Sequence, residues 1–274
     1  MSIWLILLIL FAVLAFMTHP SLNYRKCERW RGERFAHRGL HDIKNGLVEN
    51  TLPAFIAARD QGYGMELDIR FTRDMQVVVF HDDDLLRLAG DTRKVRQLTL
   101  RELKAIPLGG VEDARVPTLR EVLDAVDGKA PLLIELKSGL GNGKLCRALL
   151  DITADYKGEY IVESFNPLIV AWFRFHAPDM FRGQLANPPQ EYDEIPGVPG
   201  PLQNVVRQML GCTMFNWLAR PQFIAYEVGP KPLPVRFAEA MGAVKVAWTS
   251  HSKDTEKDYD VVIFEHYLPR KRFK

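Results

Sequence analysis

The sequence predicts an α/β fold: a (β/α)8 barrel of the TIM type, preceded by one N-terminal transmembrane helix. Short runs rich in Val, Ile and Phe alternate with longer helix-like stretches, about eight times in roughly 240 residues. No Gly-rich dinucleotide loop follows any of these runs, which argues against a doubly wound sheet. The first 24 residues form a separate, uncharged and largely apolar segment.

Residues 1–24 are predicted to be a transmembrane anchor. Residues 2–24 contain no Asp, Glu, Lys or Arg, and about 20 apolar residues can cross a bilayer core of roughly 30 Å. No Lys or Arg precedes the apolar core, and Thr-His-Pro-Ser follows Met17, so an uncleaved anchor is favoured over a secretory peptide. Basic residues in the linker 25–33 follow the span, and the positive-inside rule then places the barrel domain, 34–274, in the cytoplasm. We therefore expect a single-pass membrane protein.

Composition favours a folded globular domain. Hydrophobic residues make up 47% and charged residues 26% of the chain, and its net charge is +2. Basic residues gather near the ends, at 25–34 and 270–274, so no nucleic-acid partner is expected. Cys27, Cys146 and Cys212 are odd in number and widely spaced, which indicates neither a disulfide framework nor a zinc site and suits a reducing compartment.

Eight short runs are predicted as the barrel strands, because they are too short for helices and are bounded by turn residues. They are residues 34–37, 65–71, 132–136, 160–164, 181–184, 223–227, 244–248 and 261–264. The helix-like stretches between them are residues 52–61, 118–126, 143–155, 167–176 and 234–241. This alternation is typical of parallel βαβ units.

Two connections break the alternation. Residues 77–81 are predicted as a short extra strand, and 82–117 form a long charged connection. Long excursions from a barrel usually lie on its active face. Residues 186–200 are rich in proline and acids, and the apolar stretch 202–218 follows them. We interpret that stretch as a barrel helix with one apolar face, with contact to a membrane as the alternative.

Polar residues fall at the carboxyl ends of the first predicted strands, which is where a barrel builds its active face. They are His37, Glu66, Asp68, His81, Glu135 and Lys137. Spacings of two residues put Glu66 and Asp68 on one side of their strand, and Glu135 and Lys137 on one side of the next. Each pair alone is typical of a solvated strand face or a salt bridge, but together they are hard to explain that way.

Charged side chains on inner strands are costly to bury unless they pair or bind a metal. The three carboxylates, Glu66, Asp68 and Glu135, therefore predict an oxygen-rich site suited to Ca²⁺ or Mg²⁺. His37 and His81 have ordinary pKa values near neutrality and are suited to exchanging protons with a reacting group.

Five motifs follow one another in order between residues 35 and 137. They are His37-Arg38-Gly39, Glu49-Asn50-Thr51 with Ala54-Phe55, Glu66-x-Asp68, His81-Asp82 with Leu85 and Arg87, and Glu135-x-Lys137. This order closely resembles the glycerophosphodiester phosphodiesterase family. Further along, Glu163-Ser164-Phe165-Asn166 and Val246-Ala247-Trp248-Thr249 are also similar to it. The chain departs from the family at Ser250-His251, where Val-Asn is frequent, and at Phe264-Glu265, where Thr-Asp-x-Pro is common; both departures bear on substrate contacts.

The resemblance implies a barrel, one divalent cation, and hydrolysis of glycerophosphodiesters to glycerol 3-phosphate and an alcohol. On this hypothesis Glu66, Asp68 and Glu135 ligate the cation. His37 and His81 divide the proton transfers, and the attacking group is either the substrate's own glycerol hydroxyl, through a cyclic phosphate, or water.

The remaining polar residues of these motifs have supporting roles on the same hypothesis. Arg38 and Lys137 donate to the phosphate. Glu49 and Asn50 are either supports behind the metal site, with a weak fourth ligand as one option, or parts of the turn that enters the helix at 52–61.

Two other functions fit the same residues. The first is hydrolysis of membrane lysophospholipids by a lysophospholipase D reaction, in which an anchored barrel faces a lipid substrate. The second is a catalytically silent, membrane-anchored phosphodiester binder. The chain keeps every ionisable residue that the chemistry needs, which argues against the silent binder.

Overall fold

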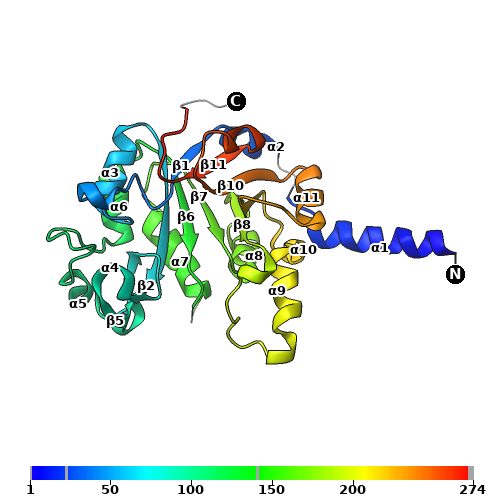
Figure 1. Cartoon of the computed structure of the whole chain (residues 1–274), viewed down its shortest axis with the longest axis horizontal. Helices are drawn as coiled ribbons and strands as arrows, with labels where there is room; N and C mark the ends of the chain where they lie inside the picture. Colours follow the sequence, from blue (N-terminus) through cyan, green and yellow to red (C-terminus); the bar gives the residue numbers. More distant parts are fainter. Residues whose placement is uncertain (1, 22–23, 140–141, 271–274) are drawn as a thin grey trace.

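The computed structural model describes residues 2–21, 24–139 and 142–270. Eight parallel strands close into a barrel in the order β1-β11-β10-β9-β8-β7-β6-β2, and β2 pairs with β1 to complete the ring (Figure 1). Their bounds are β1 Arg34–Ala36, β2 Gly64–Phe71, β6 Leu132–Leu136, β7 Tyr160–Ser164, β8 Arg182–Ala186, β9 Phe223–Glu227, β10 Val244–Ser250 and β11 Val261–Phe264. The predicted barrel is therefore confirmed.

Helices cover the outside of the barrel in the places that the sequence predicts. They are α3 Leu52–Asp60, α6 Leu119–Val126, α7 Asn142–Thr153, α8 Pro167–His176 and α11 Leu233–Ala240. The apolar stretch 202–218 forms two short helices, α9 Gln203–Gly211 and α10 Asn216–Ala219. Short 3-10 helices lie at Ile43–Asn45, Val95–Gln97, Pro189–Glu191, Gly200–Leu202 and Thr255–Asp258.

Alternation along the strands divides the core into two parts. One set of side chains fills the barrel interior, including Phe35, Leu133, Ile161, Phe223 and Ile263. The residues between them face the helices and form the larger core, as Ala36, Leu67, Ile134, Val162 and Val262 do. Continuing the inward set toward the strand ends leads from these apolar residues to the polar residues of the predicted site.

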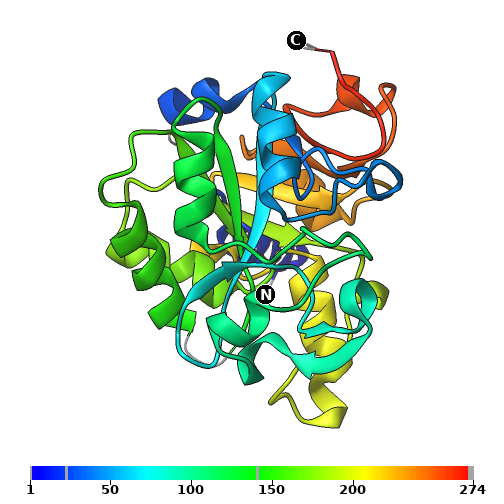
Figure 2. The ribbon, with the colours of Figure 1, turned by 90° about the vertical axis from the view of Figure 1, so that its left-hand side faces the viewer.

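The long connection after β3 (Val77–Val79) is a small unit with its own apolar core. It contains β4 Asp84–Leu85, α4 Leu86–Ala89, β5 Asp91–Lys94 and α5 Leu100–Lys104. Phe80, Leu85, Leu103 and Val116 are buried together in it. Figure 2 shows this excursion, in teal, below α3 and α6. Because β3 pairs antiparallel with the carboxyl half of β2, the excursion is held beside the polar strand ends.

The predicted transmembrane span over residues 1–24 is not supported. Helix α1 covers only Ile3–Thr18, and 16 residues rise about 24 Å, which is less than a bilayer core of roughly 30 Å. The helix ends at Thr18 because His19 precedes Pro20 and takes an extended conformation (ψ 124°). Within the described part of the chain, no helix is both long and apolar enough to cross a membrane.

The carboxyl half of α1 packs against the protein itself. The rings of Phe11 and Phe237 lie 5.4 Å apart, and Arg220 donates hydrogen bonds to the carbonyl oxygens of Phe16 and His19. Figure 1 shows the amino-terminal part of α1 extending away from the barrel. The predicted single-pass topology, membrane partner and cytoplasmic orientation depend on such a span and are not supported either.

Residues predicted as a linker, 25–33, overlap helix α2 (Tyr24–Trp30). Its Cys27 and Trp30 are buried and pack into the barrel interior, where the Trp30 ring lies 6.0 Å from that of Phe181. The division of the chain at residues 24 and 33 remains a prediction. Residues 271–274, most of the predicted basic cluster at the C-terminus, lie outside the described residues.

Candidate active site

Three buried carboxylates converge from the middle of β2 and the carboxyl end of β6. Asp68 and Glu135 are register partners, and Glu66 lies two residues before Asp68 on the same side of its strand. One oxygen from each lies within 4.8 Å of the others, and the exposed fractions of Glu66, Asp68 and Glu135 are 2%, 1% and 5%. Oxygen ligands at this spacing fit a hard divalent cation.

Electrostatics agrees with that fit. Burial, followed by the charges of Asp68 and Glu135, raises the pKa of Glu66 well above its ordinary value. Burial also raises the pKa of Glu135, although Lys137 opposes this. The Lys137 ammonium lies 2.7 Å from both Asp68 Oδ1 and Glu135 Oε2. Burial alone would raise the pKa of Asp68, but the positive charges of Lys137, His81 and Arg38 hold this pKa well below its ordinary value. Cations of the protein thus balance part of the cluster, and a bound divalent ion would balance the rest.

The turn after β1 carries two side chains to Asp68. Arg38 Nε lies 3.6 Å from Asp68 Oδ2, and Asn50 Nδ2 donates to the same oxygen at 2.8 Å. The backbone N–H of Arg38 donates to Glu66 Oε2 at 3.0 Å. The turn depends on Gly39, which has φ +83° and where a Cβ would lie 2.9 Å from the carbonyl carbon of Ala54. Arg38 and Asn50 therefore belong to the surroundings of the carboxylates.

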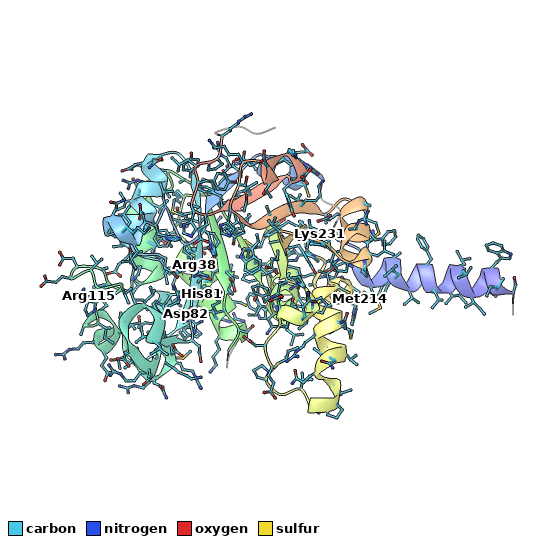
Figure 3. All side chains as sticks on the ribbon, in the orientation of Figure 1. Arg38, His81, Asp82, Arg115, Met214 and Lys231 are labelled. Carbon is cyan, nitrogen blue, oxygen red and sulfur yellow. The ribbon has the colours of Figure 1, made fainter. Side chains whose placement is uncertain are left out.

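His81 lies after β3, at the start of the excursion. Its Nδ1 is 2.6 Å from Asp82 Oδ1, and Arg87 Nε donates to Asp82 Oδ2 at 2.7 Å. Arg87 also pairs with Glu49, which accepts from Arg38 Nη1 at 2.8 Å. Figure 3 shows Arg38, His81 and Asp82 in the same region of the molecule. Glu49 thus links Arg38 to His81 through Arg87 and Asp82. Within the described part of the chain, it has no hydrogen bond to Glu66, Asp68 or Glu135.

His37 lies after β1 and is 8% exposed. Its Nε2 is 3.9 Å from Glu66 Oε2, and its Nδ1 is 3.1 Å from Glu265 Oε2. Burial lowers the pKa of His37 despite the neighbouring Glu265. For Glu265, burial is outweighed by the neighbouring His37 and His41 rings, which hold its pKa far below the ordinary carboxyl range. His37 thus lies between two carboxylates, one of them in the cluster.

No site role was predicted from the sequence for the polar and aromatic residues on the later strands, although two of its motifs contain Glu163, Phe165 and Trp248. Glu163 is the register partner of Glu135, is 2% exposed, and has no hydrogen-bond partner for either carboxylate oxygen within the described chain. Phe165 lies two residues further along, with its ring 5.2 Å from that of Trp248. Trp248 and Glu227 line a pocket of about 330 Å³. Extending the two-residue spacing from Glu135 and Lys137 to the later strands would have found these residues.

Comparison with known proteins agrees with the geometry. A glycerophosphodiester phosphodiesterase of Caldanaerobacter subterraneus is 35% identical over 162 residues, which cover 55% of this chain and 65% of that protein. Lysophospholipase D GDPD1 of Mus musculus is 33% identical over 159 residues, covering 53% and 48% of the two chains. The chain thus spans less than two thirds of these curated relatives.

Solved structures share the fold. A glycerophosphodiester phosphodiesterase of Thermotoga maritima has a TM-score of 0.58 and 27% identity, over 84% of this chain and 93% of that one. An Oleispira antarctica phosphodiesterase, in complex with the product sn-glycerol-3-phosphate, has a TM-score of 0.67 and 20% identity, over 87% and 94%. The family model for the glycerophosphoryl diester phosphodiesterases matches residues 37–264, from His37 to Phe264 at the end of the last strand. The chain therefore belongs to the glycerophosphoryl diester phosphodiesterase family.

Proposed function

We propose that the protein hydrolyses glycerophosphodiesters to glycerol 3-phosphate and an alcohol, with one divalent cation and two histidines. The observation that carries the proposal is the pair of carboxylate-backed histidines beside a buried three-carboxylate cluster. Family membership supports it, as does the product named in the Oleispira antarctica structure.

Glu66, Asp68 and Glu135 would hold the cation, either Ca²⁺ or Mg²⁺, because they supply an all-oxygen donor set in a buried position. Such an ion, when bound, supplies polarisation of a phosphate oxygen. Arg38 and Lys137 lie against the same carboxylates, so they are placed to donate to a phosphate that approaches the cluster.

His37 and His81 divide the proton transfers. One imidazole accepts the proton of the attacking hydroxyl, and the other gives a proton to the oxygen of the leaving alcohol. The attacking hydroxyl belongs either to the glycerol of the substrate or to water. Detection of a cyclic glycerol phosphate during turnover would identify the first route, and its absence in a rapid-quench time course would identify the second.

The direct test is release of glycerol 3-phosphate by the purified chain from diesters of choline, ethanolamine, serine and glycerol. We expect release with Mg²⁺ or Ca²⁺, loss of release in excess chelator, and recovery when the cation is restored. No release from any diester with either cation would leave the silent binder as the better account. Undiminished release in chelator would remove the cation from the proposal.

Lysophospholipase D activity is a second candidate, favoured by the relative from Mus musculus that bears this name. Leu202 and Val205, at the start of α9, are 51% and 54% exposed. Comparing glycerophosphocholine with lysophosphatidylcholine separates the two activities. The first proposal expects the diester without an acyl chain to have the higher kcat/KM, and the second expects the reverse.

A further inference from the structure

Glu265, the residue directly after β11, connects three histidines. Its Oε2 is 3.1 Å from Nδ1 of His37, and its Oε1 is 3.2 Å from Nε2 of His41 and 3.2 Å from Nε2 of His266. The side chain of Glu265 is 19% exposed. One carboxylate oxygen therefore serves His37, and the other is engaged by two histidines that do not reach the carboxylate cluster.

The barrel itself sets the distance between Glu265 and His37. Strands β1 and β11 are register partners at Ala36 and Phe264, and the N–H of His37 donates to the carbonyl oxygen of Phe264 at 2.9 Å. The N–H of Glu265 donates in turn to the carbonyl oxygen of Ser250 at the end of β10, also at 2.9 Å. Both backbones are thus held by the strand ladder, so the contact does not depend on a free loop.

This contact fixes how the His37 ring is presented. An ionised carboxylate only accepts hydrogen bonds, so Nδ1 carries the hydrogen and Nε2 is left with its lone pair. Nε2 is the nitrogen on the side of Glu66, at 3.9 Å from Oε2. Without an acceptor at Nδ1, the ring is free to flip and to exchange its hydrogen between the two nitrogens. Glu265 therefore determines which nitrogen of His37 faces the carboxylate cluster.

We infer that Glu265 is a positioning residue for His37, and that His41 and His266 hold Glu265 in place. The inference rests on the proposed function for its effect on turnover, but the ring orientation is a property of the protein alone. No contact joins Glu265 to Glu66, Asp68 or Glu135 directly within the described residues, so its effect on the reaction passes through His37.

The kinetic test compares Glu265→Leu with Glu265→Gln, whose amide oxygen still accepts from Nδ1. We expect E265L to lower kcat about 10–100-fold, by analogy with residues that orient metal-bound histidines, with a small change in KM. E265Q should recover part of that loss. Glu239→Gln, which removes a similarly buried glutamate from its 2.5 Å contact with Lys231 outside the site, should leave kcat unchanged.

A double-mutant cycle separates positioning from a general loss of structure. In a His37→Ala background, E265L should have almost no further effect, since the ring that it positions is gone. The same fold loss in both backgrounds, or near-normal kcat in E265L, would overturn the inference. Circular dichroism and melting curves of each variant show whether it is folded. If E265L is not folded, the cycle is measured with E265Q in its place.

A second readout does not depend on turnover. Long-range ¹H–¹⁵N spectra report which imidazole nitrogen carries the hydrogen, and the His37 signals are identified by their loss in H37A. We expect the Nδ1–H form in the wild type and in E265Q, and its loss in E265L. An unchanged His37 tautomer in E265L would overturn the inference. If the wild type hydrolyses no diester, the proposed function fails while this spectrum still tests the positioning.

Discussion

His81 and His37 are both backed by a carboxylate at Nδ1, but the two pairs are built differently. His81 takes its carboxylate from the next residue, Asp82, at 2.6 Å. His37 takes its own from Glu265, 228 residues away, at 3.1 Å. The first pair lies in the excursion and is tied to Arg87, whereas the second forms where the last strand closes on the first. One pair therefore depends on local sequence and the other on closure of the barrel.

The largest effects should come from removing either ring. His37→Ala and His81→Ala should each lower kcat by roughly 10²–10⁴-fold while the fold is kept, because each removes one proton-transfer group. The control is His176→Gln, since His176 stacks on Trp172 at 4.3 Å on the outer helix α8 and touches no site residue. Near-normal turnover in both alanine variants would contradict the assignment.

Removing the local carboxylate should have a smaller effect. Asp82→Leu leaves His81 Nδ1 without its acceptor, and we expect kcat to fall about 10–100-fold, with partial recovery in Asp82→Asn. Asp155→Asn is the matched control, because Asp155 also accepts from an arginine, Arg120, but outside the site. A loss in D82L that equals the loss in H81A would mean that Asp82 does more than orient the ring.

The comparison also explains what the sequence could predict. Asp82 follows His81 directly, so the motif contains both members of the pair. Glu265 was noted only as a departure from the family pattern, because its partner is defined by pairing of β1 with β11 rather than by sequence distance. The sequence likewise gives no sign that His41 contacts Glu265, because this contact needs the turn at Gly39.

In the fold as well, features set by neighbouring residues were predictable from the sequence, and features set by distant strand pairing were not. Strands β6, β7, β9 and β11 have the predicted bounds, because short buried runs between turn residues are a local signal. Strand β8 ends two residues later than predicted, at Ala186, where pairing with β9 extends it. The predicted span over residues 1–24 is not supported, because hydropathy continues through His19-Pro20 whereas the helix stops before these residues.

The central claim is that the two carboxylate-backed histidines have different roles in one reaction. It is tested most directly by measuring kcat of H37A and H81A on two glycerophosphodiesters, one with choline and one with p-nitrophenol as the leaving group. A p-nitrophenolate needs no proton to leave, so the variant that lacks the general acid should recover most of its loss on this substrate. The account predicts recovery in one variant and persistent loss in the other. Equal recovery in both variants, or near-normal turnover of the choline diester in both, would contradict it.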